Sequence, residues 1–243
     1  MTFGAVGDLH GDFDSLDRIM ARHPEVAFWV CPGDVASESG EYPQPRAPFF
    51  WIKGNNEDFD FVAAQPAGGG TIPNLHYIPN GVSIQAPGGL TLAGLGGTFA
   101  PTWYEKQAFE LPAARATARR GTARGHAESS PTKRDDKRRH FVHDEVDACK
   151  HLSGIDIFLS HEAARPFLLT PQRKTGPSRP LDAGKTPINE VLTAMRPRLH
   201  VFGHHHRYTV EERQNVPSIG LEMVSTSYLI FNGKSLAHQR IAT

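Results

Sequence analysis

The chain has 243 residues, with 26 lysines and arginines against 26 aspartates and glutamates, so its formal net charge is zero. This balance excludes a global field that would attract nucleic acid or a membrane, and any electrostatic recognition must come from local patches. Hydrophobic residues make up 39% of the sequence, which is enough to form a globular core. The sequence contains neither a secretory signal nor an apolar run of about 18 residues, so we expect a cytoplasmic protein without membrane contact.

The first part of the chain predicts strands that alternate with a helix. Short apolar runs indicate strands at 2–7, 26–30 and 49–52. Between the first two runs, apolar residues recur with helical spacing over 14–22. A strand–helix–strand order of this kind implies a parallel sheet covered by helices.

The remainder predicts further strands and helices around two polar insertions. The expected elements are a hairpin of 82–85 and 90–95, helices at 143–152 and 187–195, strands at 155–159 and 199–202, and antiparallel strands within 221–241. Polar loop insertions are expected at about 112–140 and 165–186, within one domain that spans 1–243. The first is rich in basic residues, which could grip a phosphate backbone or form a solvated loop.

Five of the predicted strands end in side chains of the kind that bind metals. These residues are Asp8, His10, Asp34, Asn55, His161, His204 and His206. The carboxyl ends of parallel strands line one crevice, so residues distant in sequence should meet there. Carboxylate, amide and imidazole ligands suit Mn²⁺, Fe²⁺ or Zn²⁺ better than Ca²⁺. Two such ions, roughly 3.5–4 Å apart, can clamp a phosphate and generate a hydroxide for in-line attack.

The polar clusters also resemble a known family in their order along the chain. They read Asp8-Leu9-His10-Gly11, Gly33-Asp34, Gly54-Asn55-Asn56-Glu57, Ser160-His161-Glu162 and Gly203-His204-His205-His206. This order is similar to the DxH, GD, GN[H][DE], H and GHxH motifs of the calcineurin-like metallophosphoesterases. The resemblance implies an α/β fold, a four-layer α/β/β/α sandwich of two mixed β-sheets flanked by helices.

The same resemblance implies a metal-dependent hydrolase, in which a hydroxide bridging two divalent metals attacks a phosphoester. Asp8, His10 and His206 would hold the first metal. Asn55, His161 and His204 would hold the second, and Asp34 would bridge the two.

Three other residues are candidates for catalysis. Asn56 stands where the family has a histidine that helps the leaving group depart, and an amide cannot act as a general acid near neutral pH. His205 could replace that function, or the substrate could have a good leaving group. Arg165 could bind phosphate or form a salt bridge. Glu57 is expected to cap a helix N-terminus rather than touch substrate.

Within the family, the segments 73–77, 92–97 and 156–161 resemble the lariat-RNA debranching enzymes, although many of those have cysteine at the position of Asp8. A phosphodiester is therefore the favoured substrate, with nucleic acid or a nucleotide as candidates. One alternative is a phosphomonoesterase or protein phosphatase, but the residues after Asp34 lack the arginine typical of Ser/Thr phosphatases. Another alternative is a catalytically silent scaffold, but every expected ligand is present. The sequence carries no signal for the oligomeric state.

Overall fold

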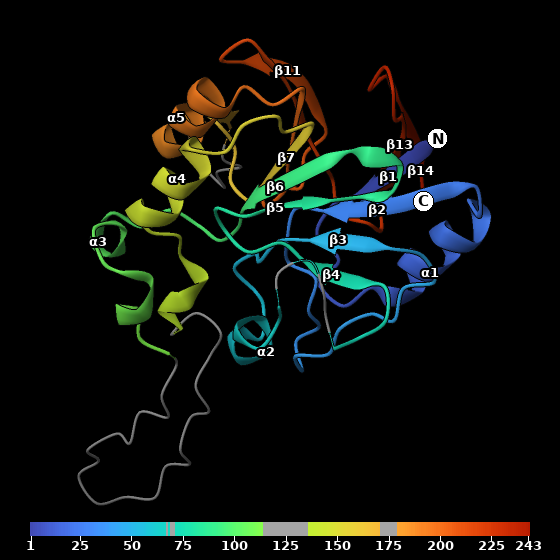
Figure 1. The fold of residues 1–243 in the computed structure, drawn as a ribbon, viewed down its shortest axis with the longest axis horizontal. Coiled ribbons are helices and arrows are strands. Elements are labelled where there is room, and N and C mark those ends of the chain that lie inside the picture. Colours follow the sequence, from blue (N-terminus) through green and yellow to red (C-terminus); the bar gives the residue numbers. More distant parts are fainter. Residues whose placement is uncertain (67, 69–70, 114–135, 171–178) are drawn as a thin grey trace, which may run out of the picture.

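The computed structural model describes residues 1–66, 68, 71–113, 136–170 and 179–243. Its main feature is a pair of six-stranded sheets with helices on their outer faces (Figure 1). The first sheet has the strand order β14-β13-β1-β2-β3-β4. Its strands are β1 (Thr2–Val6), β2 (Val26–Cys31), β3 (Phe49–Trp51), β4 (Leu75–Tyr77), β13 (Ser227–Asn232) and β14 (His238–Ala242). Strands β1 to β4 run parallel, whereas β13 pairs antiparallel with β1, and β14 pairs antiparallel with β13 at the edge.

The second sheet has the order β11-β12-β10-β7-β6-β5. Its strands are β5 (Ser83–Gln85), β6 (Thr91–Leu95), β7 (Ile157–Ser160), β10 (Leu199–Phe202), β11 (Thr209–Arg213) and β12 (Val216–Gly220). The four central strands are parallel, and the two edge strands β5 and β11 are antiparallel. Both sheets are therefore mixed, as the resemblance implied.

The alternation of side chains along each strand explains why the sheets pack against each other. In β2, Phe28 and Val30 belong to the core between the sheets, while Trp29 and Cys31 face the helical layer. In β7, Ile157 and Leu159 face the first sheet. Successive residues of a strand point to opposite faces of the sheet, so a strand that is apolar throughout can bury side chains on both faces.

Helices cover the two outer faces, which gives four layers in total. The first sheet is covered by α1 (Phe13–Arg22) and α2 (Phe59–Ala63), and the second by α4 (His143–Lys150) and α5 (Thr186–Met195). Helix α1 begins where the Asp12 side chain accepts a hydrogen bond from the Ser15 amide, at 3.2 Å. It buries Leu16, Ile19 and Met20 against the sheet. The predicted α/β/β/α sandwich is confirmed.

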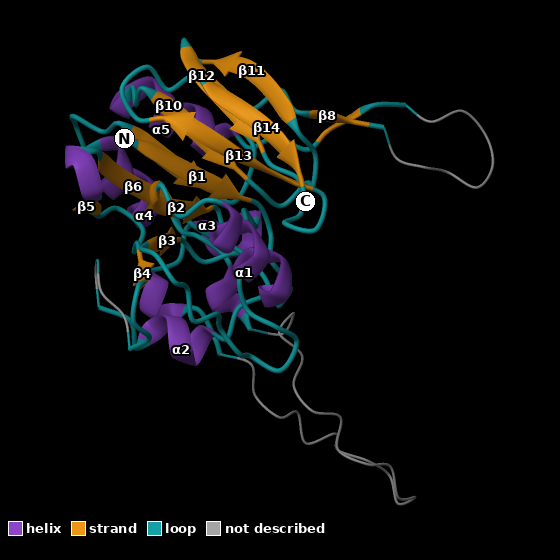
Figure 2. Ribbon diagram, turned by 90° about the vertical axis from the view of Figure 1, so that its right-hand side faces the viewer, coloured by secondary structure: helices purple, strands orange, loops and turns teal. Residues whose placement is uncertain are grey.

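The structure also adds elements that the sequence did not indicate. They include α2, the short helix α3 (Pro101–Tyr104), β4, β11, β12, and 3-10 turns at Pro87–Gly89, Ala108–Glu110 and Lys137–Arg139. The expectation of a plain loop at 165–186 is wrong in part, because β8 (Leu168–Leu169) and β9 (Leu181–Asp182) pair there and project from the body (Figure 2).

Most of the predicted basic insertion, residues 114–135, lies outside the described residues. Residues 171–178 of the second predicted loop also lie outside them. Within the described part of the chain, none of the helices is both long and apolar enough to cross a bilayer.

Candidate metal centre

The strand ends bring all seven predicted ligands to one edge of the sandwich. Four of them follow strands of the first sheet: Asp8, His10, Asp34 and Asn55. Three follow strands of the second sheet: His161, His204 and His206. Two groups of side chains have ligand-type atoms that lie within 4.8 Å of one another, Asp8–His10–His206 and Asp34–His161–His204. Each group combines residues from both sheets.

The first group faces solvent. The His206 Nε2 lies 2.8 Å from the Asp8 carboxylate and 3.3 Å from the His10 Nε2. Asp8 is buried, whereas the His10 and His206 side chains are 30% and 41% exposed. A substrate could therefore approach the centre from this side.

The second group is more deeply buried, and its geometry fixes the orientation of one imidazole. The His161 Nδ1 lies 2.8 Å from the Pro32 carbonyl oxygen, which can only accept, so Nδ1 carries the proton. The Nε2 lone pair then points toward the Asn55 Oδ1, at 3.1 Å, and toward Asp34. This is the arrangement in which metal-binding histidines are usually held.

Asp34 lies between the two groups. One of its oxygens, Oδ2, is 3.7 Å from the His10 Nε2 and 3.6 Å from the His161 Nε2. The other oxygen, Oδ1, accepts hydrogen bonds from the backbone amides of Asn55 and Asn56, at 2.6 and 2.8 Å. The carboxylate is thus anchored on one side and faces both groups with the other.

The electrostatics of the site suit cations. Burial alone would raise the pKa of Asp34, but His161, His10 and the bonds from Asn56 outweigh it and lower the pKa. Burial, with neighbouring histidines, lowers the pKa of His204 to about 3. Burial would lower the pKa of His161, but the charges of Asp34 and Asp8 outweigh it and raise the pKa, and the hydrogen bond to Asp8 raises the pKa of His206. The buried carboxylates thus attract positive charge, and carboxylates and imidazoles are ligands of divalent ions, so the residues fit two such ions.

The backbone around these ligands is unusual. His10, Asp34, His204 and His206 all have positive φ, between 47° and 66°. Such values are uncommon for residues other than glycine, and they cluster at functional sites. Gly54 is required for a different reason, because a Cβ there would lie 2.0 Å from the Asp34 Oδ1.

Glu57 was expected to cap a helix N-terminus, and this expectation is wrong. Helix α2 is capped by Asp58. The Glu57 carboxylate is buried and accepts hydrogen bonds from the amides of Val35, Ala36 and Gly54, at 3.0 to 3.2 Å, and from the Tyr42 hydroxyl at 3.0 Å. It therefore joins the loop after β2 to the loop after β3. Its place after the asparagine motif was the sequence signal, and two of its amide partners, Val35 and Ala36, are 22 and 21 residues away in the chain.

The three proposed catalytic residues differ in position. The Asn56 side chain donates a hydrogen bond to the Asp34 Oδ2, at 2.8 Å. His205 is largely buried with its ring stacked on Phe167, and burial lowers its pKa to about 4. Arg165 is half exposed, and its Nε lies 2.8 Å from Asp182. The salt-bridge interpretation therefore describes Arg165 in this structure.

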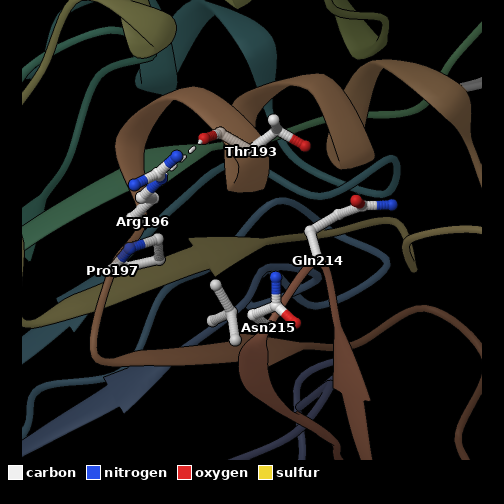
Figure 3. A pocket seen from close by; sticks show the side chains of 6 residues that line it. Thr193, Arg196, Pro197, Gln214 and Asn215 are labelled. Atoms are coloured by element: carbon white, nitrogen blue, oxygen red, sulfur yellow. Dashed lines mark hydrogen bonds between the residues drawn. The ribbon is translucent and has the colours of Figure 1, made fainter.

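A separate pocket, of about 290 Å³, lies at the amino ends of β10 and β12, away from the strand ends that carry the candidate ligands (Figure 3). Arg196, at the end of α5, and Gln214 and Asn215, in the β11–β12 turn, provide its polar side chains (Figure 3). All three are exposed, and no buried charge points into the pocket. It is therefore not part of the candidate centre.

Comparison with known proteins agrees with this fold. The family model of the calcineurin-like phosphoesterases matches residues 1–208. The fold and site thus define a hydrolase of phosphoester bonds, and the chain belongs to the calcineurin-like phosphoesterase family. A search of curated proteins finds no match to the sequence.

Solved structures with similar folds have distant sequences. TT1561 of Thermus thermophilus is 11% identical, with a TM-score of 0.60 over 99% of this chain and 98% of that chain. GAP50, the anchor in the inner membrane complex of Plasmodium, is 12% identical, with a TM-score of 0.52 over 100% of this chain and 84% of that chain. An archaeal phosphodiesterase is 10% identical, with a TM-score of 0.48 over all of both chains. At these identities the likeness concerns the fold alone.

Proposed function

We propose that the protein is a two-metal phosphodiesterase, with Mn²⁺, Fe²⁺ or Zn²⁺ in the candidate centre. The single observation that carries this proposal is the position of Asp34 Oδ2, within 3.7 Å of imidazoles from both ligand groups. In this assignment Asp8, His10 and His206 would hold one ion, and Asn55, His161 and His204 would hold the other. Asp34 would be a ligand of both.

The side chains of this site have distinct tasks in the proposed reaction. Bound divalent ions supply a nucleophile at neutral pH and stabilise charge on the phosphoryl oxygens. The Pro32 carbonyl orients His161, and the amides after Gly54 orient Asp34. The half-exposed His10 and His206 leave the first group accessible to the substrate.

The neighbourhood of Asn56 favours a diester with a good leaving group. Its amide is engaged with Asp34, and an amide is not a proton donor for a leaving alkoxide. His205 is a poor replacement, because its pKa of about 4 leaves it unprotonated near neutral pH. We therefore rank a phosphomonoester with a poor leaving group below a diester, with nucleic acid or a nucleotide as the candidate natural substrates.

The test compares three substrates with each candidate metal: bis-p-nitrophenyl phosphate, p-nitrophenyl phosphate and branched RNA. We expect hydrolysis of the activated diester, and a loss of at least about 100-fold in the His161→Ala variant, because one metal ligand is removed. His151→Ala is the matched control, since that histidine is exposed and bonded only to the backbone of its own helix. A preference for the monoester would contradict the diesterase assignment. Wild-type inactivity with every metal would favour a silent scaffold.

A further inference from the structure

A cluster of titratable side chains around one buried carboxylate lies beside the second ligand group. It consists of Glu162, Lys185 and His205, and we call it the Glu162 cluster. Glu162 is 2% exposed, and its Oε1 accepts a hydrogen bond from the Phe99 amide at 3.2 Å. Its Oε2 has no hydrogen-bond partner among the described residues, but lies 3.7 Å from the Lys185 Nζ and 3.8 Å from the His205 Nε2. These distances are too long for hydrogen bonds.

The backbone of Lys185 is fixed next to the loop that carries His161. The Lys185 amide donates to the Ala163 carbonyl at 2.9 Å, and Lys185 forms an isolated bridge with Ala164. The side chain starts from this anchor and ends beside Glu162, with 26% of its surface exposed. Glu162 directly follows His161 in the chain, and the Lys185 Nζ lies 3.7 Å from the Glu162 Oε2. The ammonium therefore lies near the second ligand group.

Other basic side chains in this part of the structure are engaged. The Lys53 ammonium donates to the carbonyls of Arg138 and His140, both at 3.1 Å. The Arg138 guanidinium binds Asp136 and Asp60. Arg165 binds Asp182. The Lys185 ammonium, in contrast, forms an ion pair with a carboxylate at 3.7 Å, and among the described residues it donates no hydrogen bond shorter than that, so its three donors can turn to a ligand.

We propose that Lys185 binds a phosphoryl oxygen of the substrate at the rim of the metal centre, with Glu162 holding the ammonium in place. This inference rests on the proposed phosphoesterase function. A lysine ammonium is a compact charge with three donors, and its bonds to phosphate oxygens are charge-assisted. The buried Glu162 restrains the flexible lysine stem, so less conformational entropy is lost when phosphate binds. Lys185 would thus have the task that the sequence suggested for Arg165.

The experiment measures binding of inorganic phosphate to the full-length, Mn²⁺-loaded protein by isothermal titration calorimetry at low ionic strength. We expect Lys185→Met to raise the phosphate Kd about tenfold, because one charge-assisted hydrogen bond is lost. Lys185→Arg should stay within about threefold of wild type, because the charge remains. Arg165→Gln is the matched control, and we expect no change in its phosphate Kd.

Two further measurements separate this inference from alternatives. The Mn²⁺ affinity of Lys185→Met should be no lower than that of wild type, because Lys185 is not a metal ligand and its positive charge repels cations. If Lys185→Met does not fold with Glu162 left unpaired, the double variant Lys185→Met/Glu162→Gln removes both charges and should show the same tenfold loss.

Unchanged phosphate affinity in the lysine variants, an equal loss in Arg165→Gln, or no phosphate binding by the wild type would overturn the inference. If the wild type binds phosphate through Lys185 but hydrolyses no phosphoester, the proposed function fails and the binding site stands.

Discussion

The backbone of the candidate centre determines which residues are tolerated there. A non-glycine residue in the left-handed region costs roughly 1–2 kcal/mol, and His10, Asp34, His204 and His206 all adopt it. Several such residues in one small region indicate that surrounding contacts hold them there. Gly54 is one source of this constraint, because its missing Cβ lets Asp34 approach the backbone.

The substitution Gly54→Ala tests this close approach. The new Cβ would lie 2.0 Å from the Asp34 Oδ1, so the carboxylate must move. We expect Mn²⁺ affinity to fall at least about tenfold and stability by about 1–3 kcal/mol, as for other overpacked sites. Calorimetric metal titration and urea unfolding measure the two effects. In the control Gly89→Ala no atom lies within 4 Å of the new Cβ, so metal affinity should not change, although its positive φ costs some stability. Equal metal affinities in both variants would argue against this geometry.

At the residue scale, the sequence could predict which candidate ligands lie close together, but not the residues that support them. Their proximity could be predicted because each candidate follows an apolar run and matches a motif position, and their assignment as metal ligands stays a prediction. The hydrogen bonds of Glu57 could not be predicted, because its carboxylate oxygens accept from the amides of Val35 and Ala36, which only folding brings near. The engagement of Arg165 with Asp182 was likewise hidden, because β9 is too short and polar to be recognised.

Among the elements, the loops after β2 and β3 depend on one buried carboxylate. Glu57 accepts three backbone hydrogen bonds from them and a fourth from Tyr42. Burial, with the adjacent Glu57 charge, raises the pKa of Tyr42, so its hydroxyl stays protonated and donates. The spacing between Asp34 and Asn55 is therefore maintained by a residue that binds no metal.

Two substitutions should separate the parts of this contact. Tyr42→Phe removes the hydrogen bond that the hydroxyl donates to Glu57 and the one that it accepts from the Asp58 amide, and should cost about 1–3 kcal/mol of stability. Glu57→Ala leaves three buried amides unpaired and should cost more than Tyr42→Phe. Urea unfolding of the metal-free protein measures both. Tyr208→Phe, which loses a partly exposed bond to His238, is the control and should cost less than Tyr42→Phe. If Tyr42→Phe and Glu57→Ala were equally destabilising, the amide bonds would not be important.

The central strands could be predicted as elements, but the edges could not. β7 and β10 are apolar runs that lie within the predicted ranges or differ by one or two residues. β11 alternates between half-buried and exposed residues and contains three charged side chains, so no apolar run marks it. Its position is determined by pairing with β12, which is a tertiary effect.

For the molecule as a whole, a buried histidine links folding to pH. The His200 ring lies 2.7 Å from the Ser160 Oγ and 3.1 Å from the Ser218 Oγ, so it connects β10 to both neighbouring strands. Burial lowers the pKa of His200 to about 3, from 6.5. Above pH 6.5 the ring is neutral in both the folded and the unfolded state. As the pH falls from 6.5 toward 3, only the unfolded state gains the proton, and stability declines.

We therefore expect the free energy of unfolding contributed by this group to be about 2 kcal/mol lower at pH 5 than at pH 7. Replacing the histidine by a residue that cannot titrate, His200→Gln, should remove that part of the pH dependence. Urea unfolding of the metal-free wild type and variant at both pH values gives the difference, and contributions from other histidines such as His140 cancel. An identical pH dependence in the two proteins would refute the assignment.

The ligand groups each draw side chains from both sheets, and this has a consequence for assembly. An ion in either group would add a non-covalent link between two layers that meet through an apolar core and through hydrogen bonds at the site, such as the one between the His161 Nδ1 and the Pro32 carbonyl oxygen. Because such ions bind the assembled sandwich and not the separated sheets, their binding free energy adds directly to the cohesion of the layers. Separation of the sheets would release the ions, so metal retention would report whether the two halves of the sandwich remain docked.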